Sequence, residues 1–297
     1  MKLPASSLVP LVIVVSIAIA RVPSLAAQAV NRMVYVTITD AKGAPVTDFT
    51  PANFKIKEGG KDREILKAEP AKARPHIALL VEERLAPEPS TRVALFEFVK
   101  RINGAAEISL ITVGLRNTTV VPYVTEPNVL LKAINELSLN PQPTSNLTEG
   151  INDVAKLLEQ QRPERPVIVV VCLSGGQAGG GSASSVLTQL RQSGAMLYSV
   201  TYGPPSTSNS ANLGTMGDES GREQVLGDGA KQSGGRRLDV VATSAMPKAL
   251  QQVADDLTAQ YVITYALPDG VKPDRRFSIT TDRKGITMRA PAALPDR

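Results

Sequence analysis

Apolar residues follow two different patterns along the chain. Near the N-terminus, short runs at 34–39, 54–57 and 64–68 alternate between apolar and polar positions. Alternation of period two, broken by turn sequences such as Asp-Ala-Lys-Gly, is typical of antiparallel strands that bury one face. Roughly forty residues in a few strands cannot enclose a core of their own. We therefore expect this segment to pack against another part of the chain.

From Pro75 onwards the apolar runs become continuous and alternate with amphipathic helices. Strand-like runs read HIALLV, EISLITVG, VIVVVCLS, AMLYSVTYG and YVITYAL. Continuous apolar runs predict strands buried on both faces, as in a parallel sheet covered by helices. Helices are predicted at 91–102, 129–137, 147–160, 184–192 and 247–259. The expected fold class is α/β, with a doubly wound, mostly parallel sheet and helices on both faces.

Three further segments complete the predicted fold. The run at 119–123 contains Pro122, which cannot donate to a strand ladder, so we expect it at an edge of the sheet. Residues 203–235 are rich in Gly, Ser, Pro and Asn and predict a long exposed loop with one weak helix at 223–232. Residues 275–291 predict a hairpin that turns at 282–285. We expect the N- and C-terminal strands to form one small β-sandwich.

The first 29 residues have the layout of a secretory signal peptide. Lys2 precedes an apolar run at 8–20, and Ala27 and Ala29 occupy the two small-residue positions of a cleavage site. The run is short for a membrane span, which needs about 20 residues. We expect a secreted, periplasmic or outer-envelope protein without a membrane span in the mature chain. An uncleaved N-terminal anchor is the alternative, and Arg21 directly behind the run favours it.

These patterns predict four segments. They are a signal peptide at 1–29, sandwich strands at 30–73, an α/β domain at 74–266 and closing sandwich strands at 267–297.

Composition excludes several classes of chemistry. The chain has one histidine, His76, and one cysteine, Cys172, so it has no Cys/His zinc cluster, no haem or iron–sulfur ligation and no internal disulfide framework. The net charge of +5 falls to +3 without Lys2 and Arg21, and the remaining basic residues are scattered, which argues against nucleic-acid binding. Cys172 lies in an apolar run, where we expect it to be buried and unreactive.

No catalytic constellation can be assembled from the sequence, and we expect no enzyme. Ser174 lacks the glycine two positions earlier that shapes a nucleophile elbow, and His76 begins the first long strand, at the opposite end of the sheet. The glycine-rich stretch 175–182 lacks the ending of a phosphate-binding loop; we interpret it as a loop before a helix capped by Ser182 or Ser184. A secreted hydrolase, the less favoured alternative, would need acidic residues near Ser174.

Ligands of a doubly wound sheet bind beyond the carboxyl ends of its strands. Three loops at these ends read VEERLAPEPS (81–90), NPQPTSNLTEG (140–150) and CLSGGQAGGGSASS (172–185). With the opening segment VYVTITDAKGAPVTDFTPANFKIKEGGK and the closing segment ALQQVADDLTAQYVITYALPDG, they resemble a von Willebrand factor type A domain, and more narrowly the secreted bacterial proteins related to it. The resemblance implies a non-catalytic adhesion or assembly role and a protein partner.

The resemblance also implies a metal-ion-dependent adhesion site. In that family an Asp-x-Ser-x-Ser loop, a Thr and a second Asp hold magnesium or manganese through oxygen ligands. The corresponding positions here are Glu82, Arg84, Ala86, Ser145 (or Thr144, if the loop is one residue longer) and Gly175. Only two of the five keep an oxygen that could coordinate, and Arg84 brings a permanent positive charge. We expect a degenerate site that binds neither metal ion, and no other cofactor.

Two hypotheses remain open for the degenerate site. The guanidinium of Arg84, braced by Glu82 or Glu83, could take the place of the ion and receive a partner carboxylate. Alternatively, the three residues form a solvated charged loop. For the whole protein, the alternative function is an envelope scaffold that binds partners at the edges of the β-sandwich through strand addition.

Overall fold

The computed structural model describes residues 30–85, 89–138, 145–175, 182–203 and 216–295, with side chains from 220 onwards in the last range. The predicted signal peptide at 1–29 lies outside these ranges. None of the described helices is both long and apolar enough to cross a membrane.

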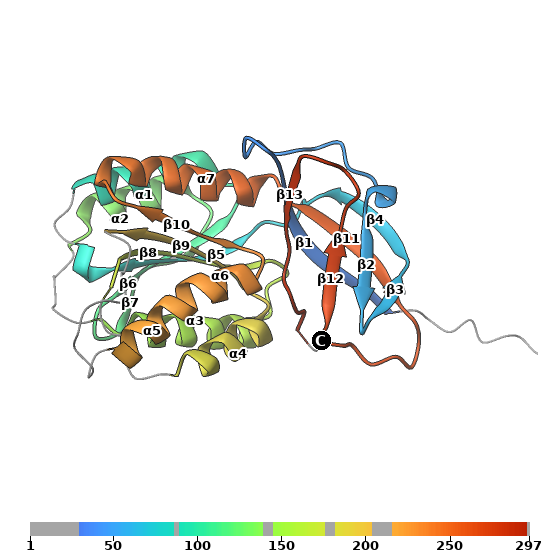
Figure 1. Cartoon of the computed structure of the whole chain (residues 1–297). Helices are drawn as coiled ribbons and strands as arrows, with labels where there is room; N and C mark the ends of the chain where they lie inside the picture. Colours follow the sequence, from blue (N-terminus) through green and yellow to red (C-terminus); the bar gives the residue numbers. More distant parts are fainter. Residues whose placement is uncertain (1–29, 86–88, 139–144, 176–181, 204–215, 296–297) are drawn as a thin grey trace, which may run out of the picture.

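Six strands form the central sheet in the order β10-β9-β8-β5-β6-β7 (Figure 1). Only β7 runs antiparallel to its neighbour. It lies at the edge of the sheet and contains Pro122, which confirms the prediction for this run. In chain order the strands are β5 (His76–Glu82), β6 (Glu107–Val113), β7 (Asn117–Val124), β8 (Pro166–Leu173), β9 (Met196–Tyr202) and β10 (Arg236–Val240).

Helices cover both faces of this sheet, as predicted. In Figure 1, α1 (Pro89–Ile102), α2 (Pro127–Glu136) and α7 (Met246–Thr258) lie on one face. The other face carries α3 (Leu147–Gln161), α4 (Ala183–Ser193), α5 (Met216–Gln224), a π-helical turn (Val225–Gly229) and α6 (Ala230–Gln232). Successive residues of β5 enter the two cores alternately, Leu79 on one side and Leu80 on the other. This alternation explains why the strands are apolar throughout.

The terminal strands form two antiparallel sheets that face each other across a third core. One sheet has the order β13-β1-β11-β4 and the other β12-β2-β3. The strands are β1 (Val30–Asp40), β2 (Lys55–Glu58), β3 (Lys61–Arg63), β4 (Ile65–Pro70), β11 (Tyr261–Leu267), β12 (Phe277–Thr280) and β13 (Ile286–Arg289). Short 3-10 turns lie at Pro51–Asn53, Glu83–Leu85 and Thr243–Ala245. N- and C-terminal strands thus share one sandwich, as predicted.

The structure corrects three predictions about single elements and adds one strand that was not predicted. Strand 261–267, predicted in the α/β domain, instead pairs with β1 and β4 in the sandwich. One face of this strand lies on the sandwich core, so its residues are buried alternately from Tyr261 to Leu267. The predicted hairpin at 282–285 is wrong, because β12 pairs with β2 and β13 pairs with β1, in different sheets. The run 236–240 forms strand β10 at an edge of the central sheet, where polar residues are tolerated. The helix predicted at 223–232 is present but begins earlier, because residues 216–222, predicted as loop, are helical too.

The sandwich and the α/β domain share buried polar contacts. One face of β1 looks away from the sandwich core, and there Thr37 Oγ1 accepts a hydrogen bond of 2.9 Å from Gln260 Nε2. The carboxylate of Asp256 on α7 forms ion pairs with Arg236 of β10 at 3.0 Å and Arg289 of β13 at 2.6 Å. These contacts hold the two parts of the chain against each other.

Cys172 is fully buried in β8, and burial raises the pKa of its thiol to about 11. At pH 8 only about a thousandth of such a thiol is ionised, and reagents react with the thiolate. We expect no alkylation of the native protein by iodoacetamide at pH 8 and complete alkylation in denaturant, measured by mass spectrometry. A Ser278→Cys variant, with an exposed thiol on β12, is the control and should be alkylated once in the native state. Rapid labelling of native Cys172 would contradict its burial.

Candidate functional site

The site is built around Glu82, the last residue of β5, at the carboxyl edge of the central sheet. β5 lies between β8 and β6, so the Glu82 side chain emerges at the centre of this edge. Its side chain is 0% exposed. An unpaired carboxylate in this position would be strongly destabilising, so its partners decide what the site can do.

Three groups donate four hydrogen bonds to the Glu82 carboxylate. Arg222 donates two hydrogen bonds to it, from Nη1 to Oε1 at 3.1 Å and from Nη2 to Oε2 at 2.9 Å. The Ser145 hydroxyl donates to Oε1, and the backbone N–H of Leu173 donates to Oε2 at 2.9 Å. Two parallel N–H···O bonds between a guanidinium and a carboxylate are among the strongest geometries available to side chains. Both oxygens of Glu82 are therefore occupied.

Arg222 lies on α5, and the sequence analysis did not identify it. Its side chain is fully buried, and Nη2 also donates to the carbonyl oxygen of Leu173 at 2.8 Å. A signal was present, because Arg222, Val225, Leu226 and Gly229 follow the i, i+3, i+4, i+7 spacing of one helix face and all four are buried. An arginine within an otherwise apolar helical stripe indicates a buried carboxylate partner.

Arg84 lies at the rim of the same site. Its Nη1 donates to the carbonyl oxygen of Gly175 at 3.1 Å and lies 3.6 Å from Glu82 Oε1. Its side chain is 20% exposed, in contrast to the fully buried Arg222. Within the described ranges, Arg84 has no polar partner other than these two residues. Arg84 is therefore the guanidinium of this site that reaches the surface.

The structure brings together most of the positions that the sequence analysis selected. Glu82, Arg84, Ser145 and Gly175 are joined by direct contacts. Ala86 and Thr144 lie outside the described residues. Arg84 lies beside Glu82, at 3.6 Å from its Oε1, but the bidentate pair with this carboxylate is made by a second guanidinium, that of Arg222.

Glu83 is not a brace for Arg84. The Glu83 carboxylate packs against Gly114, so closely that a Cβ atom on residue 114 would collide with it.

The described residues do not fit a hard divalent cation. Such an ion needs several free oxygen ligands, whereas the carboxylate of Glu82 is saturated and the Ser145 hydroxyl is directed at it. A guanidinium also stands beside both oxygens. Elsewhere in the described ranges, no group of three His, Cys, Asp or Glu side chains could hold a metal ion.

The other residues considered for chemistry lie apart from each other. His76 begins β5, whereas Ser174 follows β8, and because these strands are parallel the two residues lie at opposite ends of the sheet. The ring of His76 stacks on Tyr123 at 3.6 Å and contacts Glu107. Ser182 caps α4 by accepting a hydrogen bond from the N–H of Ser185, as predicted.

Comparisons with known proteins agree with this architecture. Residues 89–230 match the family model of the von Willebrand factor type A domain. No curated protein matches the chain.

Several solved structures are similar to the chain. Proximal thread matrix protein 1 from the mussel byssus is 12% identical with a TM-score of 0.49, covering 63% of this chain and 49% of its own. A von Willebrand factor type A protein from Catenulispora acidiphila is 8% identical with a TM-score of 0.47, over 92% and 75% of the two chains. BatB from Bacteroides thetaiotaomicron is 11% identical with a TM-score of 0.43, over 61% and 98%. The chain spans about half the length of the mussel protein.

Removal of Arg222 should be strongly destabilising, because it leaves the Glu82 carboxylate buried without its cation. We expect Arg222→Met to lower the free energy of unfolding by about 3–5 kcal/mol, measured by urea denaturation. A double variant, Glu82→Met with Arg222→Met, should regain most of this loss, since no charge is then left unpaired. Arg101→Met, which removes an exposed ion pair with Asp255, is the control and should have a much smaller effect. An equal, small loss in Arg222→Met and Arg101→Met would contradict the buried pair.

Proposed function

Because the chain contains a von Willebrand factor type A domain, an interaction-type fold, we propose that it is an exported, non-catalytic protein-binding module of an adhesion or assembly system. It binds its partner through the carboxyl edge of the central sheet, around Glu82 and Arg84. Export rests on the signal-like sequence at 1–29, and the role in adhesion or assembly rests on the family.

The observation that carries the proposal is the buried pair between Glu82 and Arg222. Where the family implies a divalent cation, this chain supplies a guanidinium from its own helix α5. A covalently attached cation cannot dissociate, so the binding face is complete without magnesium or manganese. The site is therefore metal-independent and needs no cofactor.

Arg84 is the residue of this face that meets the partner. Buried Arg222 uses its two terminal nitrogens on Glu82 and Leu173, whereas Arg84 is partly exposed and held in place through one nitrogen by the Gly175 carbonyl. A planar guanidinium with free N–H groups favours a carboxylate, which it can bind with two parallel hydrogen bonds. An acidic side chain of the partner protein is the ligand that this chemistry fits.

Metal independence can be tested by thermal denaturation. We expect the melting temperature to be unchanged by millimolar MgCl₂ or MnCl₂, because a ligand stabilises a protein only when it binds the native state. Sodium chloride at matched ionic strength is the control for general salt effects. A saturable rise in melting temperature with either divalent ion, absent with sodium, would contradict this part of the proposal.

The role of Arg84 can be tested by comparing what immobilised variants retain from envelope extracts. We expect proteins retained by the wild type to be lost with Arg84→Glu, because the substitution reverses the charge that faces the partner carboxylate. Lys132→Glu, an equal change of charge on exposed α2, should retain them. Quantitative mass spectrometry gives the measurement, and equal melting temperatures show that both variants fold. Identical retention by wild type and Arg84→Glu would contradict the proposed face.

A further inference from the structure

A second surface with the features of a binding site lies where the sandwich meets the α/β domain. Strand β1 has eleven residues, but its two neighbours cover it unequally. On one side β11 pairs with residues 30–36, and on the other side β13 pairs only with residues 37–40. Among the described residues, the N-terminal half of β1 therefore has a strand on one side only.

The direction of the free backbone groups follows from the register. Ile38 O accepts a hydrogen bond from Val46 N, and Asp40 N donates to Ala44 O, on the side of β1 opposite to β13. Since the N–H and C=O of one residue point the same way and alternate along a strand, even-numbered residues face β11. Asn31, Met33 and Tyr35 present their N–H and C=O groups to the open edge. Within the described ranges, no hydrogen bond reaches these six groups.

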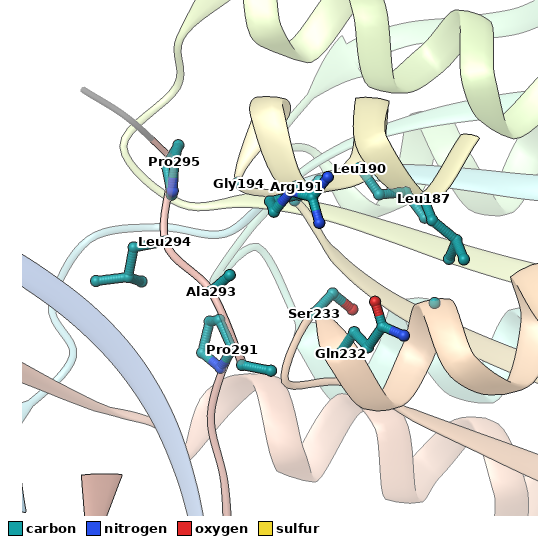
Figure 2. A pocket seen from close by; sticks show the side chains of 13 residues that line it. Leu187, Leu190, Arg191, Gly194, Gln232, Ser233, Pro291, Ala293, Leu294 and Pro295 are labelled. Atoms are coloured by element: carbon teal, nitrogen blue, oxygen red, sulfur yellow. The ribbon is translucent and has the colours of Figure 1, made fainter. Parts of the chain in front are cut away.

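The described part of the chain does not close this edge. After β13, the C-terminal tail (residues 290–295) contains Pro291 and Pro295, which have no N–H to donate. The N–H of Ala292 turns away from β1 and donates to Gln232 O of α6 at 2.8 Å. Figure 2 shows residues of the tail, among them Pro291 and Leu294, beside Leu187 and Leu190 of α4 and Gln232 of α6. The pocket that these residues line has a volume of about 70 Å³. The tail is therefore not packed tightly against α4 and α6.

A groove of about 310 Å³ runs along the open edge. It is bounded by β1, by the tail and by the starts of β8 and β9, and its lining includes the apolar residues Met33, Val34, Met196, Leu267 and Leu294. The polar groups in its wall already have partners: Tyr35 donates to Glu164 at 3.0 Å, and Arg32 pairs with Glu58. The groove therefore suits apolar side chains next to a strand ladder.

The charge around the groove is positive. Arg165, which lines it, is buried and donates to Gln260 and to the carbonyl oxygens of Ala73 and Leu257, with no carboxylate within ion-pairing distance in the described part of the chain. Arg191 and Arg275 flank the end of the groove at Leu294 and Pro295. Glu164 is the acidic residue in the lining. An occupant with acidic ends is complementary to this distribution.

We propose that this groove binds an extended segment of a partner protein, which adds as a strand to the edge of β1 at Asn31, Met33 and Tyr35. The segment places apolar side chains in the groove and an acidic residue near Arg191. Main-chain hydrogen bonds supply affinity in this mode of binding, and the groove and the charges supply selectivity. This surface lies at the opposite end of the α/β domain from Glu82 and Arg84, so the two can be tested separately.

The test uses a labelled seven-residue peptide in which valine and threonine alternate and both ends are glutamate. We expect it to bind the protein in fluorescence anisotropy. Binding should slow hydrogen exchange at least about tenfold at the amides of residues 31, 33 and 35, while those of 32, 34 and 36, already bonded to β11, stay protected throughout. The same peptide with N-methyl groups on its ladder-facing residues should not bind.

The charge is tested with Arg191→Glu, which should weaken binding of the acidic peptide about five- to tenfold and strengthen binding of a lysine-ended version. Lys132→Glu on α2 is the control and should leave both affinities unchanged. Absence of peptide binding, or protection without the odd-even pattern, would overturn the proposal. Protection of the amides of residues 31, 33 and 35 in the absence of peptide would also overturn the proposal. If this protection increased with protein concentration, the edge would be covered by a second copy of the chain; if it did not, the edge would be covered by the chain itself. We expect the Arg84→Glu variant to bind the peptide as the wild type does, because the groove and the face around Glu82 are different sites.

Discussion

A carboxylate that water cannot reach needs a cation beside it, and the carboxyl edge of the central sheet is organised by this requirement at Glu82. β5 delivers Glu82 to the middle of the edge, and α5 delivers Arg222 to meet it. Ser145 before α3 and the Leu173 N–H at the end of β8 complete the shell. Two strand ends, one loop and one helix thus meet at a single buried ion pair, whose desolvation is offset only while every partner stays in place.

The same helical segment connects this edge to the rest of the molecule. This segment, residues 216–232, carries Arg222 near its start and ends at Gln232 after the π-helical turn. The carbonyl oxygen of Gln232 accepts a hydrogen bond from the N–H of Ala292 in the C-terminal tail. At the other end of the sheet, β1 packs one face on the sandwich core and the other on the α/β domain. The ion pairs of Asp256 with Arg236 and Arg289 lie at the same junction. The two parts of the chain therefore share contacts at their border while their exposed faces remain separate.

Much of the fold could be predicted because burial leaves a local trace. Strands covered on both faces read as unbroken apolar runs, and the helices follow their own period, so β5, β6, β8 and most helices lie close to their predicted positions. The errors have a common cause. β11 and β12 carry the right residues for strands, but their partners lie far away in sequence, and β10 is polar because it lies at an edge. Periodicity indicates how a strand is buried and does not identify the strand beside it.

The sequence by itself determined the fold class, the division into sandwich and α/β parts, and which positions meet at the carboxyl edge of the sheet. Only the tertiary structure identified the cation that pairs with Glu82, since Arg222 lies 140 residues from Glu82 along the chain. The open half of β1 likewise follows from where β13 stops pairing. Both depend on contacts between distant segments, which local patterns of polarity do not encode.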